Sequence, residues 1–453
     1  MMKKLVLYLL VMNLSFCFAE IKLPAVVSNN MVLQQKSNAN LWGKATKLST
    51  ITVVTSWNKK EYTTNADVEG NWLLSIATPK AGGPYTISLT DGEKPITLEN
   101  ILIGEVWVCS GQSNMEMPLA GFKNQPILNS ATLIANAKNE SLRLFKVERF
   151  IAGSPQTDCK GSWKESDSIS AKTFSAVAFQ YGQLLQQKLG IPVGIIVSSW
   201  GGTAIAPWTP SPIITDTSKI KLTASGVLYN GMIAPIVKYT IKGFLWYQGE
   251  TDRFKPSVYK AKMIDLVEKW RTEWKNENAP FYFVQIAPYQ YKDSAKSSSA
   301  ELREAQLEAS YAIKTAAMVT TLDVGAANLI HPPDKTTVAN RLANCALAIT
   351  YGKKVAYQFP AYESMKQDGN NLILTFKHAK ELVLKNKESE NFEIAGADNV
   401  FYKATVQVLN NTIILNSDKV SNPTVARYGF TNYLVGDLFN EHGIPASPFR
   451  TSK

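Results

Sequence analysis

One stretch of the chain combines a predicted strand with a serine-containing turn, Gly104-Glu105-Val106-Trp107-Val108-Cys109-Ser110-Gly111-Gln112-Ser113-Asn114-Met115-Glu116-Met117. Apolar residues alternate through Val106 and Val108, which predicts a buried strand that ends at the Gly-Gln-Ser-Asn turn. A serine hydroxyl in this place can become a nucleophile if a base takes its proton and donors receive the oxyanion. The residues indicate either acyl transfer at Ser113 or a structural turn.

The turn differs from the nucleophile elbow of α/β-hydrolases. That elbow requires Gly-x-Ser-x-Gly, and Met115 stands where its second glycine would be. If Ser113 is a nucleophile, the chain has another serine-hydrolase architecture.

A serine nucleophile at neutral pH needs a base, and the chain has only three histidines: His331, His378 and His442. His331 lies in a Pro-rich segment between an apolar run, Met318 to Val324, and a helix-like stretch, Thr337 to Thr350. A histidine on a loop between a strand and a helix suits a functional site, and its alternative is a helix-capping loop residue. His378 and His442 lie in polar turns of predicted β structure.

Two more apolar runs end in turns that could complete such a site. Phe244-Leu245-Trp246-Tyr247 is followed by Gln248-Gly249-Glu250-Thr251-Asp252, and Gly194 to Ser199 is followed by Trp200-Gly201-Gly202-Thr203. Glu250 or Asp252 could orient a histidine, and Gln248 could donate to an oxyanion. The glycine pair could let backbone N–H groups approach a ligand.

These four strand ends define an architecture. Polar or glycine-rich turns that follow successive strands are typical of an open α/β sheet with its site at the carboxyl edge. The sequence therefore predicts that Ser113, the Gly201-Gly202 turn, the Gln248 turn and His331 lie close together.

The motifs in this order resemble those of the sialate O-acetylesterase family of SGNH-type hydrolases. The resemblance rests on Gly-Gln-Ser-Asn-Met, Ser-Ser-Trp-Gly-Gly-Thr, Trp-Tyr-Gln-Gly-Glu and Ile-His-Pro-Pro-Asp-Lys, and it extends over nearly the whole chain after the first residues. It implies a flavodoxin-like three-layer α/β/α domain and a two-step acyl transfer without a cofactor. It implies Ser113 as nucleophile, His331 as base, and an oxyanion hole formed by the Ser113 amide, a glycine amide of Gly201-Gly202 and the Gln248 side chain.

The chain departs from the family pattern at two positions. SGNH enzymes usually carry an aspartate three residues before the histidine, and this chain has Asn328, which cannot stabilise an imidazolium by charge. By resemblance to related acetylesterases, Glu250 is the expected triad acid, with Asp252 and a Ser–His dyad as alternatives. Ala206 stands where the family often has glutamate.

The resemblance also implies a substrate, an O-acetylated glycan or sialic acid. The expected activity is removal of O-acetyl groups from 9-O-acetylated sialic acids, and acetyl xylan or hemicellulose is an alternative because its ester chemistry is identical. Arg253 is one candidate for pairing with a sialate carboxylate, or else an ordinary surface arginine. An alternative of another functional class is a non-catalytic carbohydrate-binding protein. Such a protein would not need Ser113, His331, Gln248 and Glu250 together.

The 453 residues are too many for one ordinary domain and predict several. We expect a signal peptide over 1–19, a β-sandwich over 20–99, the α/β esterase domain over 100–351 and a β-rich region over 352–453. Short alternating runs define the β regions, such as 52–55, 85–89, 405–409 and 412–415. Helix-like stretches at 174–189 and 257–274 lie between the strands of the α/β domain.

The amino terminus has the composition of a secretory signal. Lys3 and Lys4 precede the apolar run Leu5 to Leu14, and Ala19 offers a cleavage site; a lipoprotein reading through Cys17 is the alternative. The run is too short to span a bilayer. We expect an exported protein without stable membrane insertion, in a bacterial periplasm or outside the cell.

The net charge and the cysteine content limit the kinds of ligand and partner that the chain is expected to bind. The net charge of +11 comes from dispersed lysines, without the basic stripe of a nucleic-acid binder. A basic surface could help to capture acidic glycans or could be ordinary solvated surface. Cys109, Cys159 and Cys345 make an odd set, which argues against a disulfide framework, and no metal-ligand spacing is present.

Overall fold

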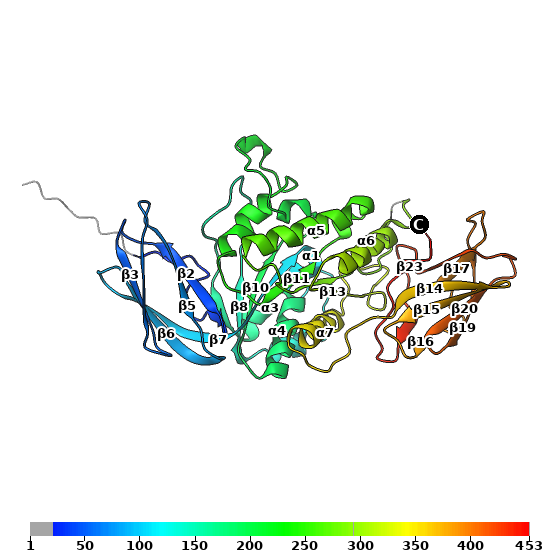
Figure 1. The fold of residues 1–453 in the computed structure, drawn as a ribbon, viewed down its shortest axis with the longest axis horizontal. Helices are drawn as coiled ribbons and strands as arrows, with labels where there is room; N and C mark the ends of the chain where they lie inside the picture. The colour runs from blue at the N-terminus through cyan, green and yellow to red at the C-terminus, as the bar shows by residue number, and fades with distance from the viewer. Residues whose placement is uncertain (1–20, 293, 453) are drawn as a thin grey trace, which may run out of the picture.

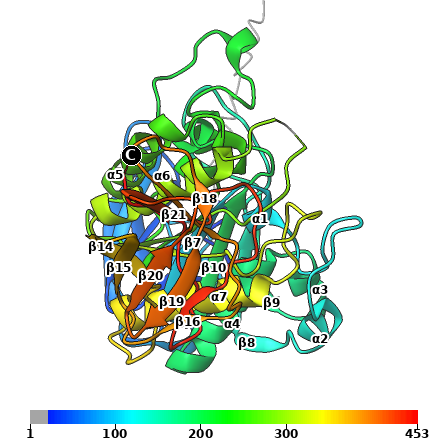
Figure 2. The ribbon, with the colours of Figure 1, turned by 90° about the vertical axis from the view of Figure 1, so that its right-hand side faces the viewer.

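The computed structural model describes residues 21–292 and 294–452. The predicted signal peptide, 1–19, lies outside the described residues. Three parts follow one another along the long axis of the molecule: an N-terminal β region, a central α/β part and a C-terminal β region (Figure 1). Viewed along that axis, the C-terminal strands lie in front of the central helices α4 and α7 (Figure 2).

The central part is a mainly parallel sheet in the order β13-β12-β11-β7-β10-β8-β9, in which only β9 pairs antiparallel. The strands expected before the Ser113 turn, the Gly201-Gly202 turn and the Gln248 turn are confirmed as β7, β10 and β11. The strand bounds are β7 (Ile96–Gly111), β8 (Asn139–Lys146), β9 (Trp163–Ser166), β10 (Val193–Ser199), β11 (Gly243–Tyr247), β12 (Phe281–Val284) and β13 (Ala316–Val319).

The register places the ends of five parallel strands at one level. Gly111 of β7 pairs with Ser199 of β10 and with Tyr247 of β11. Tyr247 pairs with Val284, which pairs with Val319 of β13. Parallel strands that end in register deliver their following turns to one edge of the sheet. The edge therefore receives the Ser113 turn, the glycine turn, the Gln248 turn and the loop that carries His331.

Helices pack against both faces of this sheet. Alternate residues of β7 point to opposite faces, with Trp107 in one apolar cluster and Val106 and Val108 in the other. The first cluster contains residues of α4 (Ala176–Leu189) and α7 (Lys335–Cys345). The second contains residues of α5 (Pro256–Glu273) and α6 (Ser298–Ala312). The helices expected at 174–189 and 257–274 are thus confirmed. The helix expected at 337–350 corresponds to α7 and the helical turn that follows it, 346–350.

The described part of the chain also contains shorter helices. They are α1 (Ser113–Glu116), α2 (Ser130–Ala135), α3 (Ser168–Lys172), η1 (Ala206–Trp208), η2 (Thr217–Lys219), η3 (Tyr229–Ile233), η4 (Ala234–Ile236), η5 (Glu250–Asp252) and η6 (Ala346–Thr350).

The N-terminal β region is continuous with the central sheet through β7. The first part of β7 pairs with β1 and β6, and its second part pairs with β10 and β11. The predicted boundary between residues 99 and 100 therefore falls inside one strand. The other strands of this region are β1 (Val32–Gln34), β2 (Asn38–Lys44), β3 (Thr50–Thr55), β4 (Glu61–Asn65), β5 (Asn71–Ala77) and β6 (Gly82–Thr90).

The C-terminal region is built from short antiparallel strands around its own apolar cluster. Its strands are β14 (Ala361–Asp368), β15 (Asn371–Lys377), β16 (Leu382–Leu384), β17 (Phe392–Ala395), β18 (Tyr402–Lys403), β19 (Thr405–Leu409), β20 (Thr412–Asn416), β21 (Val425–Tyr428), β22 (Leu438–Asn440) and β23 (Phe449–Arg450). The cluster includes Leu322, which comes from the central part, so the two parts share apolar packing.

The three cysteines in the described part of the chain are free thiols. Within the same residues, no helix has both the length and the apolar composition that a bilayer crossing requires.

Candidate active site

The turn that carries Ser113 depends on a glycine. Gly111 has a φ of +139°, and a β-carbon there would lie 2.1 Å from the carbonyl oxygen of Tyr247. This close approach lets the Gln112 N–H donate to the same carbonyl at 3.0 Å. Ser113 then begins α1 and is half-buried. Because the first N–H groups of a helix have no acceptor within it, the Ser113 amide is suited to receive an oxyanion.

The glycine turn lies directly beside Ser113. A β-carbon on Gly201 would stand 3.1 Å from Ser113 Cβ and 3.1 Å from Glu116 Oε2. The Gly201 N–H donates to Glu116 Oε2 at 2.8 Å. Gly202 is exposed with a φ of +74°, and no described heavy atom lies within 4 Å of its β-carbon position. Of the two predicted glycine donors, Gly201 therefore already has an acceptor, and Gly202 is exposed.

Glu116 connects this turn to the chain after β8. Besides accepting from Gly201, its buried carboxylate pairs with Arg149, whose Nη2 lies 2.6 Å from Oε1. The Arg149 guanidinium lies 5.2 Å from the centre of the Trp200 ring and remains about half exposed, at 51% of its side chain. Neither residue is among those predicted from the sequence. Glu116 lies three residues after Ser113 in a helix, a signal that places both on one side, whereas nothing local marks Arg149.

His331 lies on the loop between β13 and α7 and is half-buried. Its Nδ1 is hydrogen-bonded to Gln125 Oε1, and its ring packs edge-on against Phe122 with the ring centres 5.4 Å apart. The preceding carbonyl, Ile330 O, accepts from Asn114 Nδ2 at 3.2 Å. Ser113 and His331 are thus the chain neighbours of two hydrogen-bonded residues, Asn114 and Ile330.

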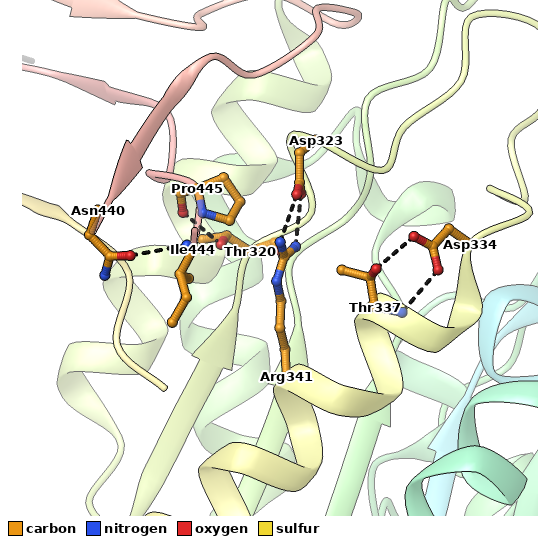
Figure 3. Close-up of polar contacts among 8 residues, drawn as sticks. All are labelled: Thr320, Asp323, Asp334, Thr337, Arg341, Asn440, Ile444 and Pro445. Atoms are coloured by element: carbon orange, nitrogen blue, oxygen red, sulfur yellow. Dashed lines mark hydrogen bonds and ion pairs between the residues drawn. The ribbon is translucent and has the colours of Figure 1, made fainter. Parts of the chain in front are cut away.

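Side-chain contacts fix both ends of the histidine loop (Figure 3). At its start, Arg341 of α7 holds Asp323 through two hydrogen bonds of 2.8 and 2.7 Å. At its end, Asp334 caps α7 by accepting from the Thr337 N–H at 2.9 Å. The C-terminal region adds a contact next to Asp323, because Thr320 Oγ1 donates to Pro445 O at 2.8 Å (Figure 3).

The environment of His331 keeps its ring neutral. Burial, assisted by the positive charge of Lys335, lowers the pKa of His331 from 6.5 to about 4. A neutral imidazole is the form that can accept a proton, and the His331 ring has this form throughout the neutral range.

Glu250, the expected triad acid, faces Asn114. Its Oε1 accepts from Asn114 Nδ2 at 2.5 Å, and the Asn114 Oδ1 accepts from Lys335 Nζ, also at 2.5 Å. Burial raises the pKa of Glu250 and lowers that of Lys335 to about 7. Within the described residues no hydrogen bond joins Glu250 to His331. The structure therefore brings Glu250 to the site with Asn114 between it and the histidine loop.

Gln248 and Asp252 are bonded to one another. The Gln248 amide nitrogen donates to Asp252 Oδ2 at 2.7 Å and to Thr203 O at 3.2 Å, and Asp252 Oδ2 also accepts from the Ile205 N–H at 2.9 Å. These bonds tie the Gln248 turn to the chain after the glycine turn, immediately before Ala206. Gln248 is fully buried, and both its amide hydrogens are used there. Within the part of the chain that the structure describes, no hydrogen bond joins Gln248 or Asp252 to Ser113 or His331.

The predicted substrate arginine, Arg253, occupies a packing position. Its side chain is buried, with 8% exposed. The guanidinium lies 3.7 Å from the centre of the Phe254 ring and 3.9 Å from that of Tyr291, and it donates to Ser298 Oγ at 3.3 Å. The structure thus gives the guanidinium protein partners rather than an open face.

An open cleft of about 780 Å³ adjoins the site. Two of its lining residues contact the residues singled out above: Glu116 binds the glycine turn, and Phe122 packs on His331. The cleft is basic, because the cations that line it outnumber the carboxylates of Glu116 and Glu148. Those cations are Lys146, Arg149, Lys164 and Lys172.

The site and the comparisons together define a class, the carboxylic ester hydrolases that act on carbohydrates. A family model described as carbohydrate esterase, sialic acid-specific acetylesterase, matches residues 103–348, more than half of the chain. The chain belongs to this family. The matched range contains every residue of the predicted site.

Similar proteins cover nearly the full length. The chain is 28% identical to mouse sialate O-acetylesterase, over 90% of this chain and 89% of that protein, and 27% identical to the human protein, over 93% and 91%. Its structure is similar to that of a carbohydrate acetylesterase from Xanthomonas citri, with 31% identity, a TM-score of 0.90 and coverage of 96% of this chain and 100% of that one.

Proposed function

We propose that this protein is a serine O-acetylesterase that removes acetyl groups from acidic sugars, 9-O-acetylated sialic acids in particular. One observation carries the proposal. Ser113 and His331 flank the hydrogen bond between Asn114 and Ile330, at the edge of the sheet where the parallel strands end. The glycine turn lies beside the serine. In the proposed site Ser113 is the nucleophile, neutral His331 is the base, and backbone amides beside the serine are the oxyanion donors.

The proposed reaction has two steps. His331 Nε2 takes the Ser113 Oγ proton while Oγ bonds to the acetyl carbonyl carbon. The bond from that carbon to the sugar oxygen then breaks, and His331 returns its proton to the sugar oxygen. Water attacks the acetyl-serine and gives a proton to His331. Acetate leaves, and Ser113 Oγ regains its proton.

We assign the oxyanion first to the amides of Ser113 and Gly202. The Ser113 amide lies in the first turn of α1, where N–H groups have no acceptor within the helix, and Gly202 is an exposed residue of the glycine turn beside Ser113. Gly201, whose amide donates to Glu116, serves to bring this turn close to Ser113. Gln248 can join the donors only after its amide leaves Thr203 or Asp252.

Arg149 is the residue we propose for an acidic substrate. Glu116 fixes one edge of its guanidinium, its side chain is about half exposed at 51%, and it lines the basic cleft beside the site. A planar guanidinium suits a carboxylate, and the neighbouring lysines raise the local positive potential. This arrangement favours a sugar acid over a neutral polysaccharide.

The proposal also includes the layer arrangement of the fold, the domain bounds and the export of the protein. We propose the flavodoxin-like three-layer arrangement for the α/β part, with domains near 20–99, 100–351 and 352–453. We also propose that residues 1–19 direct export.

Acetate release from 9-O-acetylated sialic acid and from acetylated xylan, measured side by side, tests the function. Ser113→Ala is the control. We expect faster release from the sialate, lost in the variant. Preference for xylan would keep the chemistry and overturn the substrate, and release from neither by an intact protein would favour a carbohydrate-binding role.

A further inference from the structure

The residue hydrogen-bonded to the imidazole of His331 is Gln125, from a part of the chain far from the predicted triad. We propose that Gln125 is the positioning residue of His331 and takes the orienting role that a triad carboxylate has in other serine hydrolases. This inference rests on the proposed function, because it concerns the base of that reaction.

A tight hairpin places Gln125 next to the ring. The backbones of Phe122 and Gln125 bond to each other in both directions at 3.0 Å, which closes a two-residue turn. Gly121, with a φ of +81°, lets the chain pass the Gln125 carbonyl, since a β-carbon there would lie 2.6 Å from that oxygen. The same segment bonds to the histidine loop again, where the Leu128 N–H donates to Pro333 O at 3.0 Å.

The hairpin therefore contacts the imidazole in two ways. Phe122 meets the ring edge-on, and Gln125 Oε1 meets Nδ1. An amide oxygen only accepts hydrogen bonds, so the proposed bond from Nδ1 to Gln125 Oε1 assigns the hydrogen to Nδ1. In a neutral ring this leaves the lone pair on Nε2, the nitrogen that would take the proton of Ser113.

Each carboxylate near the loop has another partner. Asp334 caps Thr337, and Asp323 pairs with Arg341. Glu250 accepts from Asn114, and Asp252 accepts from Gln248. Asn328, at the position of the usual SGNH aspartate, is exposed.

A glutamine and a carboxylate differ in one respect that can be measured. Both orient the ring, but only the carboxylate stabilises the imidazolium by charge. Lys335 lowers the pKa of His331, and the other charged residues on the segments that meet there are Asp334 on its own loop, Glu250 beyond Asn114 and Lys123 in the hairpin turn. A new negative charge at position 125 would oppose the effect of Lys335.

The first test is the tautomer of His331 by nitrogen-15 NMR on histidine-labelled full-length protein. His378→Gln and His442→Gln assign the signals. We expect the Nδ1–H tautomer in the native protein, a changed tautomer mixture in Gln125→Leu, and a pKa of His331 raised by about 1 unit or more in Gln125→Glu. Gln156→Leu, a half-buried glutamine that bonds to Ser154 O, is the matched control and should change nothing.

The second test is kinetic, with p-nitrophenyl acetate as the probe. Gln125→Leu should lower kcat about 100-fold with little change in KM, and Gln125→Glu should restore kcat and move the acid limb of the pH profile upward. An Nε2–H tautomer in the native protein, or a tautomer unaffected by Gln125→Leu, would overturn the inference. If the native protein hydrolyses no acetyl ester, the proposed function fails, while the NMR result still decides the role of Gln125.

Discussion

The two halves of the proposed catalytic pair are held in different ways. Ser113 follows β7, a strand of 16 residues whose last part is fully buried and paired on both sides, and its turn is fixed by backbone contacts at Gly111. His331 follows the four-residue β13 on a loop held by side chains from distant segments, Gln125 and Arg341 among them. The nucleophile is positioned by the sheet, and the base by individual polar contacts.

This difference predicts how each half tolerates change. The backbone packing at Gly111, just before Ser113, leaves no room for a β-carbon, so substitution of this glycine should affect folding. Side-chain contacts around His331 can be removed one at a time, so substitutions there should change rate and pH dependence while the fold remains.

The largest effect is expected at the nucleophile itself. Ser113→Ala should lower kcat for acetate release at least about 1000-fold, because no acetyl-serine can form. The thermal midpoint should stay near that of the native protein, since only a half-buried hydroxyl is lost. Activity within tenfold of the native value would contradict the assignment.

Gly111→Ala probes the backbone half of the comparison. The methyl group would meet Tyr247 O at 2.1 Å in a left-handed conformation, and we expect a loss of roughly 3 kcal/mol in the free energy of unfolding. Gly352→Ala is the matched control, with a φ of +64° and no described atom within 4 Å, and should cost about 1 kcal/mol. Urea unfolding of both variants measures the difference; equal losses would show that the close carbonyl does not matter.

Glu116→Ala should lower kcat by about 10- to 100-fold. The change frees the Gly201 N–H and releases Arg149, so the glycine turn loses the contact that holds it beside Ser113. Glu148→Ala, at an exposed residue of the same cleft, is the control. Equal effects of the two substitutions would remove Glu116 from the positioning of the turn.

Arg149→Ala tests the substrate. The ratio of kcat/KM for 9-O-acetylated sialic acid to that for p-nitrophenyl acetate should fall about tenfold, the loss of one charge-assisted contact. Lys164→Ala, in the same cleft, should change the ratio less because its side chain is a mobile point charge. An unchanged ratio in Arg149→Ala would place carboxylate recognition elsewhere.

The smallest effect is on pH dependence. Because the pKa of His331 is lowered to about 4, the base is neutral and active above that value, and kcat/KM should fall as the pH drops through about 4. An unperturbed histidine would lose activity near pH 6.5. Initial rates between pH 3.5 and 8, with a parallel check that the protein stays folded, decide between the two, and a half-maximum near 6.5 would contradict the described environment.

The difference between a nucleophile positioned by the backbone and a base positioned by side chains also explains what could be predicted from the sequence. Alternating and continuous apolar runs place β7, β10 and β11, and a local pattern also marks Ser113 and the glycine turn. Family resemblance and the small number of histidines single out His331. The partner of His331 has no local signal, because Gln125 lies 206 residues away and meets it only in the folded chain.

Side-chain direction could not be predicted either. Glu250, Asp252 and Gln248 lie in one turn at the expected edge, yet their hydrogen bonds lead to Asn114, Ile205 and Thr203. Arg253 follows the same turn and packs between two aromatic rings. Which way each of these residues points depends on tertiary neighbours, and spacing along the chain does not contain that information.

Covalent labelling tests the central claim, that Ser113 is the nucleophile and His331 activates it. Native protein, Ser113→Ala and His331→Gln are treated with a fluorophosphonate, and the intact mass and the labelled peptide are measured. We predict one phosphonyl group per native molecule, on the peptide that contains Ser113, no label in Ser113→Ala and strongly slowed labelling in His331→Gln. A label on another serine, or equal labelling of native protein and Ser113→Ala, would contradict the account.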